Sequence, residues 1–186
     1  MIYICVAFKE EAKPILQQWS FRRDKRAPCA LYVNEHIYLC VTQMGQERAL
    51  RALEALLQYR PPQQGDCFVN FGICAAPTSY AIGEVLRCNY LIYGEQSLRL
   101  NADTASITLQ MHDTPCRSEQ PHAVDMESFA LFNKALPLFL RCYCIKIVSD
   151  HFEPESINKE AITTLLHRGV ATLKEIIDEN CCCHRS

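Results

Sequence analysis

The stretch CYCIKIV, at residues 142–148, is almost continuously apolar and is followed at once by Ser149 and Asp150. A strand of this composition is typical of a sheet whose two faces are both covered by helices. We therefore expect a central strand here. Such a strand requires neighbouring strands on its two sides and helices that cover both of its faces.

Strand and helix patterns alternate along the remainder of the chain. Apolar runs predict strands within residues 2–8, 30–33, 37–42, 67–71, 81–93 and 107–110. Apolar residues recur at helical spacing within residues 12–19, 46–59, 123–136 and 156–178. We expect Pro14 to lie in the first turn of its helix, where its missing N–H is tolerated. The alternation predicts an α/β fold, a three-layer domain with a mixed, mostly parallel central sheet.

The domain organisation is expected to be simple. The chain has 186 residues, close to the ~150 of an average domain, and it contains no internal repeat. We expect residues 1–180 to form one domain and residues 181–186, CCCHRS, to form a cysteine-rich tail. Adjacent cysteines lack the paired spacing of a structural zinc site, so we expect no metal in this tail.

Composition argues against several classes of protein. Apolar residues make up 49% of the chain and charged residues 22%, which is the profile of a folded globular domain. The net charge of -2 and the scattered basic residues argue against nucleic acid as a partner. One cluster of basic residues is expected to be a solvated loop: Arg22, Arg23, Lys25 and Arg26. No run reaches the ~18 apolar residues of a membrane span, and residues 2–8 lack the basic lead of a signal peptide, so we expect a cytoplasmic protein with no membrane partner.

The candidates for chemistry are polar residues at the ends of the expected strands, because ligands of open α/β sheets bind beyond the carboxyl ends of the strands. The residues found there are Glu10, Glu11, Gly45, Asn70, Gly72, Ser149 and Asp150. Glu127 lies near the start of the expected helix at residues 123–136. The carboxylates of Glu11, Glu127 and Asp150 are therefore expected at one end of one sheet.

Each of these residues also has an ordinary structural explanation. Glu11 could be a first-turn helix residue, and Glu127 is favoured electrostatically near a helix N-terminus. Asp150 could cap the segment that follows it, and Gly45 could simply be a turn glycine. The residues alone leave both interpretations open, although the conjunction of three carboxylates favours a site.

Several motifs occur in an order that resembles one known superfamily. They are VAFKEE at residues 6–11, QMGQERA at 43–49, VNFG at 69–72, AIGEV at 81–85, VDMES at 124–128 and IVSD at 147–150. The chain resembles the purine nucleoside phosphorylase and 5′-methylthioadenosine/S-adenosylhomocysteine nucleosidase superfamily. The sequence at residues 44–45 and 125–128 is similar to that of the bacterial branch that includes hopanoid-associated phosphorylases.

The resemblance implies a role for each matching residue. Glu11 matches the carboxylate that activates the attacking water in nucleosidases, and Asp150 matches the acid that protonates the purine at N7. Glu127 matches the carboxylate that binds the ribose hydroxyls, and Met126 the side chain that packs on the sugar. Ser149 matches the neighbour of the acid, and Gly45, Asn70 and Gly72 lie in matching segments. This set is chemically coherent, because cleavage of an N-glycosidic bond builds positive charge on the sugar and requires a neutralised leaving base.

The chain departs from the superfamily's pattern in two ways. Asn70 and Ile73 stand where phosphorylases carry an arginine and a serine that hold phosphate, and Ala75 and Ala76 replace glycines. The chain is also short between residues 93 and 124, where members carry the elements that stack on the purine. Residues 107–116 are expected to be the remnant of that region.

The resulting expectation is hydrolysis of a purine nucleoside or 5′-thio-nucleoside by a small homo-oligomer, with no metal and no cofactor. Phosphorolysis, with phosphate as a second small-molecule partner, is the first alternative. The second is a nucleoside-binding member of the same fold that does not turn its ligand over, and a generic α/β domain is the third. Homo-oligomers of this superfamily are dimers or trimers of dimers, so a homodimer is the simplest expectation.

Overall fold

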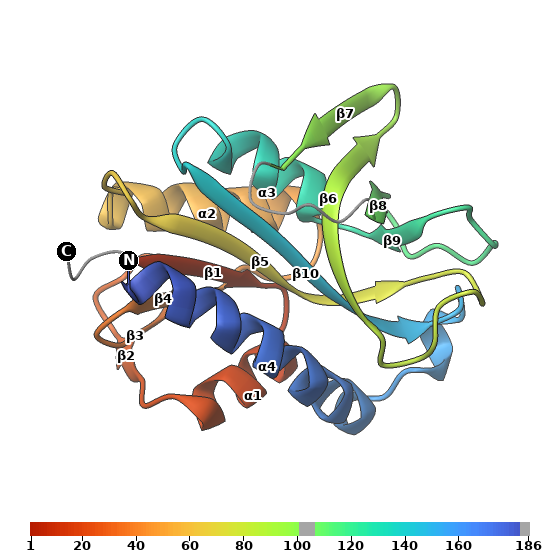
Figure 1. The fold of residues 1–186 in the computed structure, drawn as a ribbon, viewed down its shortest axis with the longest axis horizontal. Helices are drawn as coiled ribbons and strands as arrows, with labels where there is room; N and C mark the ends of the chain where they lie inside the picture. The colour runs from red at the N-terminus through yellow and green to blue at the C-terminus, as the bar shows by residue number, and fades with distance from the viewer. Residues whose placement is uncertain (101–106, 183–186) are drawn as a thin grey trace.

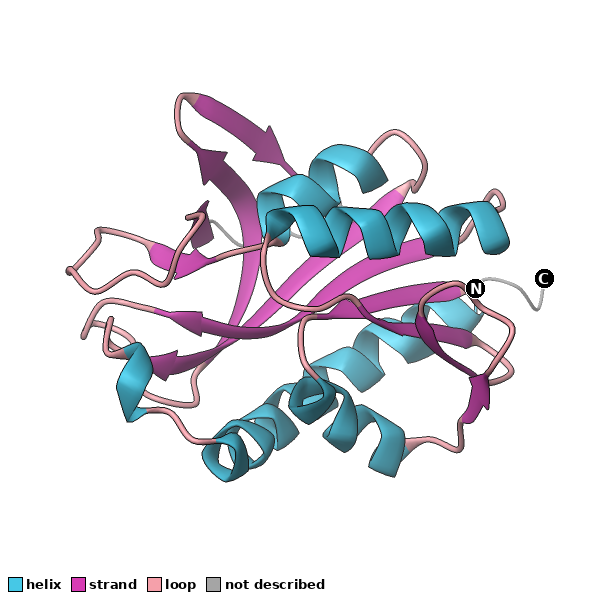
Figure 2. Cartoon of the chain, turned by 180° about the vertical axis from the view of Figure 1, so that it is seen from behind, coloured by secondary structure: helices cyan, strands magenta, loops and turns pink. Residues whose placement is uncertain are grey.

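The computed structural model describes residues 1–100 and 107–182 and shows one sheet between two helical layers (Figure 1). The strands are β1 (Ile2–Val6), β2 (Arg22–Asp24), β3 (Ala30–Val33), β4 (Ile37–Val41), β5 (Cys67–Ala75), β6 (Val85–Tyr93), β7 (Gln96–Arg99), β8 (Ile107–Met111), β9 (Ala123–Asp125) and β10 (Arg141–Asp150). The helices are α1 (Lys9–Gln18), α2 (Gln46–Tyr59), α3 (Ser128–Ala135), the short 3₁₀ helix η1 (Pro154–Ser156) and α4 (Lys159–Cys182). Helices α2 and α3 lie on one face of the sheet and α1 and α4 on the other, as both views show (Figures 1 and 2). The predicted three-layer α/β fold is confirmed.

The centre of the sheet is parallel, and antiparallel pairings attach further strands on both sides of it. Strands β4, β1, β5 and β10 run parallel in that order, and β3 and β2 extend the sheet antiparallel to β4. Strand β10 also pairs antiparallel with β6, which continues through β8 to β9. Strand β9 returns to β5 through the pair Ala75 and Val124. Five strands therefore close a ring, β5–β10–β6–β8–β9, at one end of the sheet.

Strand β10 is central and covered on both faces, as its apolar sequence predicts. Cys142, Cys144 and Val148 belong to the core beneath α2 and α3. Tyr143, Ile145 and Ile147 belong to the core beneath α1 and α4. The alternation follows from the two-residue period of a strand, which sends successive side chains to opposite faces.

Three expectations about local structure are wrong in detail. Residues 123–136 do not form one helix: β9 comes first, because Val124 pairs with both Ala75 and Gln110, and α3 begins only at Ser128. Helix α1 begins at Lys9, so Pro14 lies inside the helix and not in its first turn. Residues 22–24, expected in a solvated loop, add an edge strand to the sheet by pairing with β3.

The C-terminal helix extends further than the expected residues 156–178. It continues through Cys182, so the first two cysteines of the expected tail end α4, and residues 183–186 lie outside the described residues. None of the helices in the described residues is both long enough and apolar enough to cross a membrane.

Candidate functional site

A cavity of about 310 Å³ lies beyond the carboxyl ends of β1 and β4 and against β5, β9 and β10. The predicted residues that line it are Glu11, Asn70, Met126, Glu127, Ser149 and Asp150. The remaining two, Gly45 and Gly72, contribute no lining side chain but contact the carboxylates that do. The fold thus gathers all eight predicted residues around one cavity, from segments more than one hundred residues apart.

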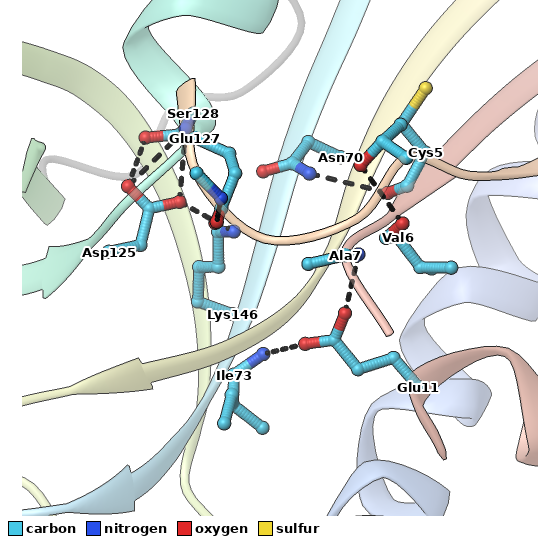
Figure 3. Close-up of polar contacts among 12 residues, drawn as sticks. Cys5, Val6, Ala7, Glu11, Asn70, Ile73, Asp125, Glu127, Ser128 and Lys146 are labelled. Atoms are coloured by element: carbon cyan, nitrogen blue, oxygen red, sulfur yellow. Dashed lines mark hydrogen bonds and ion pairs between the residues drawn. The ribbon is translucent and has the colours of Figure 1, made fainter. Parts of the chain in front are cut away.

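Glu11 is held by backbone N–H groups from two strand ends. Its Oε2 accepts a hydrogen bond from the N–H of Ala7 (2.6 Å), and its Oε1 accepts one from Ile73 (2.9 Å) (Figure 3). Oε2 also accepts a hydrogen bond from the N–H of Phe8 (3.0 Å). The bond to Phe8 caps α1, so the ordinary explanation of Glu11 as a helix-start residue is also correct. Burial raises the pKa of Glu11 above its ordinary value, and the nearby Lys146 ammonium opposes that rise.

Gly72 is required by the position of Glu11. A Cβ atom at residue 72 would lie 2.6 Å from Oε1 of Glu11, which is closer than carbon and oxygen can approach. The missing side chain therefore lets Oε1 of Glu11 lie against the backbone of β5, where it accepts the Ile73 N–H. The oxygen has one lone pair engaged by Ile73 and another available to a ligand.

Glu127 occupies the N-cap position of α3, but its side chain does not cap that helix. Its Oε1 instead accepts a hydrogen bond of 2.7 Å from the N–H of Gly45, at the start of α2. Burial, together with the neighbouring Asp125 carboxylate, raises the pKa of Glu127 to about 7. The group is therefore poised to change its charge near neutral pH.

A buried ion pair between Asp125 and Lys146 is the part of the site that sequence reasoning missed. The Lys146 Nζ lies 2.8 Å from Oδ2 of Asp125, and both side chains are almost fully buried. Asp125 also accepts hydrogen bonds from the N–H and the hydroxyl of Ser128 (Figure 3). Burial alone would lower the pKa of Lys146, but the carboxylates of Asp125 and Glu127 hold it above its ordinary value. The sequence did contain a signal of this ion pair: Lys146 lies within the otherwise apolar stretch at residues 142–148, and a buried lysine needs a partner of opposite charge.

Asn70, which lines the cavity, carries a buried acceptor without a partner. Its Nδ2 donates to the backbone carbonyl of Cys5 at 3.3 Å, whereas its buried Oδ1 has no hydrogen-bond partner. In Figure 3 this oxygen points to the side opposite Cys5. A buried acceptor without a partner is costly, so a ligand that donates a hydrogen bond would satisfy it.

Asp150 is fixed at the end of β10 by two hydrogen bonds. The Ser149 hydroxyl lies 2.7 Å from Oδ2 of Asp150, and the N–H of Glu153 donates to Oδ1 at 2.9 Å. The second bond caps the segment that follows, so the ordinary explanation of Asp150 holds beside the functional one. The Ser149 hydroxyl also lies 3.1 Å from the carbonyl of Cys74, which gives it a second acceptor.

Apolar side chains complete the walls of the cavity. They are Phe8, Met44, Phe71, Ile73, Val124, Met126, Ile157 and Ile162. A mostly apolar cavity with a few convergent polar groups is typical of a small-molecule site. The carboxylates and the Asn70 oxygen all accept hydrogen bonds, so the arrangement suits a ligand rich in hydroxyl and amino donors.

Comparison with solved structures assigns the architecture. The chain superposes on the 5′-methylthioadenosine/S-adenosylhomocysteine nucleosidase of Helicobacter pylori, in complex with butyl-thio-DADMe-Immucillin-A, with a TM-score of 0.79 at 15% identity over 96% of this chain and 97% of that chain. The chain has the nucleosidase fold. Futalosine hydrolase of the same organism gives a TM-score of 0.79 at 14% identity, over 96% of this chain and 97% of that one. The 5′-methylthioadenosine nucleosidase of Arabidopsis thaliana gives 0.79 at 17% identity, over 96% and 95%.

Comparisons of the sequence itself assign no family. No protein-family profile matches it, and no curated protein matches it in sequence. The resemblance seen in the short motifs is therefore confirmed at the level of the fold, where these nucleosidases superpose along nearly their whole length.

Proposed function

We propose that this protein hydrolyses the N-glycosidic bond of a purine nucleoside or 5′-thio-nucleoside. The observation that carries the proposal is the convergence of Glu11, Glu127 and Asp150 on one cavity of about 310 Å³, each in a different hydrogen-bonding environment. Three separately held carboxylates suit a reaction that needs a base, a sugar-binding group and an acid. The nucleosidase fold supports the same reaction class.

Glu11 is assigned as the base that activates water. Its pKa is raised by burial, which makes the carboxylate a better proton acceptor near neutral pH. The lone pair of Oε1 beside Gly72 is where a water molecule would bind. The Lys146 ammonium, on the neighbouring strand β10, would assist by favouring the ionised carboxylate.

Glu127 and Met126 are assigned to the sugar. The ionised carboxylate of Glu127 would accept hydrogen bonds from the ribose hydroxyls, and the Met126 side chain would pack on the ring. The unpartnered Oδ1 of Asn70, buried beside the same cavity, would accept a hydrogen bond from a ligand group that reached it. Positive charge that develops on the sugar in the transition state would be stabilised by these carboxylates.

Asp150 is assigned as the acid that protonates the departing base. It lies at the carboxyl end of β10, and its neighbour Ser149 holds Oδ2 in place. Proton donation to the leaving group is required because a purine anion is a poor leaving group.

Water is favoured over phosphate by the charges of the cavity. Among the described lining residues, four carry carboxylates (Glu11, Asp125, Glu127 and Asp150) and Lys146 is the only lysine or arginine. The Lys146 ammonium is already paired with Asp125. An inorganic phosphate entering this cavity would meet like charge without a free cation, and that repulsion opposes its binding.

The test is release of free base from a panel of purine nucleosides and 5′-thio-nucleosides, separated by liquid chromatography, with and without phosphate. We expect release without phosphate. Release that requires phosphate would establish the phosphorolytic alternative. No release, combined with a ligand-dependent rise in melting temperature, would establish a binding protein that does not turn nucleosides over.

A further inference from the structure

Two residues other than glycine have a positive φ in the described chain, and each lies within two residues of a side chain that lines the cavity. They are Gln43, with φ of 73°, and Phe152, with φ of 64°. Each lies within two residues of a backbone N–H that donates to a cavity carboxylate: Gly45 to Glu127 and Glu153 to Asp150. Left-handed backbone is unfavourable for residues with a Cβ atom, so it persists only where the surrounding structure imposes it.

The turn that contains Gln43 is anchored on both sides. Before it, the N–H of Thr42 donates to the carbonyl of Val6 at 2.8 Å, which fixes the end of β4. After it, the carbonyl of Gly45 accepts the N–H of Ala49 at 3.0 Å, which begins α2. Within these limits, positive φ at Gln43 and at Gly45 (94°) reverses the chain and directs the Gly45 N–H toward Glu127.

The side chain of Gln43 has no part in the cavity. It is exposed and is not among the side chains that line the site. Glutamine has no intrinsic preference for the left-handed region, unlike glycine and, to a lesser degree, asparagine. What Gln43 contributes is therefore its backbone conformation.

We propose that Gln43 is a positioning residue, whose left-handed backbone holds the Gly45 N–H on the carboxylate of Glu127 and thereby orients that carboxylate toward the ligand. The identity of the ligand rests on the proposed function. The hydrogen bond and its dependence on Gln43 do not, so the two can be tested separately.

The protonation of Glu127 reports on this hydrogen bond. The charged groups that act on Glu127 are Asp125 from β9, Lys146 from β10 and Glu11 from α1. None of the three depends on the backbone of residue 43. The Gly45 N–H favours the ionised form of Glu127, so loss of that bond alone raises the pKa of the carboxyl group further.

The experiment compares substitutions that accept or reject a positive φ. Gln43→Gly and Gln43→Asn accept it, whereas the β-branched side chain in Gln43→Val rejects it. Gln58→Val, at an exposed position in α2, controls for a surface Gln→Val change. The titration of the Glu127 carboxyl carbon is followed by NMR in protein labelled with ¹³C-glutamate, and the signal is assigned by its absence in Glu127→Gln.

We expect the Glu127 midpoint to stay near that of the wild type in the Gly, Asn and Gln58→Val proteins. In Gln43→Val we expect it to move upward by about 1 pH unit, as loss of a hydrogen bond to a charged group predicts. An unmoved midpoint in Gln43→Val would overturn the proposal. So would an equal movement in Gln43→Gly, because it would assign the effect to the glutamine side chain.

A second measurement separates this inference from the proposed function. Affinity for 5′-methylthioadenosine, measured by calorimetry at pH 8 in an Asp150→Asn background that does not consume the nucleoside, should fall about 10-fold in Gln43→Val and be retained in Gln43→Gly. If wild-type protein does not bind this nucleoside while the titrations behave as expected, the positioning role stands and the ligand assignment fails. Should Gln43→Val not fold, Gln43→Ala, which tolerates the left-handed region less well than Gly, provides the same comparison.

Discussion

Asp150 is the residue at which the proposed chemistry is most easily separated from structure. In Asp150→Asn the amide oxygen can still accept the Glu153 N–H, and the Ser149 hydroxyl can donate to Cys74 instead. We therefore expect the fold and nucleoside binding to survive while turnover falls by ~10²-fold or more, because the amide has no acidic proton. Base release and ligand-induced melting shifts measure the two effects. Unchanged turnover would remove Asp150 from the mechanism.

Glu127 should show that a binding group can reduce stability. Its folded pKa of about 7 lies above the ordinary value of 4.5, so the folded protein holds the proton more tightly than the unfolded chain. The protonated carboxyl group of Glu127 therefore makes its full contribution to the free energy of unfolding below about pH 4.5. That contribution is lost as the pH rises through 7, where ionisation of the buried group lowers the free energy of unfolding by about 3 kcal/mol. Glu127→Gln stays neutral and can still accept the Gly45 N–H.

We expect Glu127→Gln to unfold at a higher temperature than the wild type at pH 8 and at a similar temperature at pH 4. At the same time its affinity for nucleoside should fall, by about 1.5–3 kcal/mol for a lost charged hydrogen bond. Calorimetric melting curves across this pH range, with binding isotherms at pH 8, provide the measurement. A variant that is less stable than the wild type at pH 8 would show that Glu127 has a stabilising partner.

At the scale of elements, the approach of α1 to β5 depends on Gly72. In Gly72→Ala the new Cβ would lie 2.6 Å from Oε1 of Glu11, so the carboxylate must move. We expect the rate of base release to fall on the order of 10²-fold with a smaller effect on affinity, because a displaced base affects the chemical step.

Gly169→Ala is the matched control for Gly72→Ala. Its Cβ would lie 2.7 Å from Cδ1 of Ile147 and 2.9 Å from Cε2 of Phe71, in the packing of α4 on the sheet, and it meets no carboxylate. It should lower the unfolding free energy by about 1–3 kcal/mol through overpacking and change the rate much less than Gly72→Ala does. Equal rates for the two variants would show that Gly72 matters only for packing.

The ion pair between Asp125 on β9 and Lys146 on β10 should couple the effects of these two residues on stability. Lys146→Met leaves the buried Asp125 carboxylate without its cation, which should destabilise the protein by about 3–5 kcal/mol. Adding Asp125→Asn should recover part of that loss, because the amide carries no charge and can still accept from Ser128. Urea unfolding of the two single variants and the double variant measures the coupling. Additive losses would mean that the ion pair contributes nothing as a pair.

The elements also show where sequence reasoning stops. The range of α2 and the turn at Asn34 follow from local signals, namely helical spacing and a side chain that accepts the N–H groups of His36 and Ile37. Strand β9 could not be predicted in this way. Its three residues are fixed by Ala75 and by β8, which are distant in sequence, and helical periodicity extends across them. The partner of Lys146 was missed for the same reason, since Asp125 becomes its neighbour only when the ring of strands closes.

At the scale of the whole molecule, the site residues were predictable as a set and their contacts were not. Position at strand ends and the order of short motifs were sufficient to select Glu11, Glu127 and Asp150. The bonds that distinguish these carboxylates come from the backbone of other elements, Ile73, Gly45 and Glu153. Such contacts depend on the register of the sheet and on positive φ at Gln43 and Phe152. Neither the register nor these φ values can be predicted from the pattern of side chains along the sequence.

The last prediction concerns assembly. Met44 is 41% exposed, lines the cavity, and also lines an adjoining hollow of about 470 Å³ beside the first turn of α2. Apolar surface at the edge of a ligand site suits a partner subunit, so we expect a homodimer in which the second copy covers Met44. Light scattering at micromolar concentration should give twice the chain mass for the wild type. Met44→Lys should shift the mass toward the monomer, whereas Leu140→Lys, at a position 73% exposed after α3, should remain dimeric. A monomeric wild type would contradict the prediction, and dissociation caused only by Leu140→Lys would move the interface to the other end of the sheet.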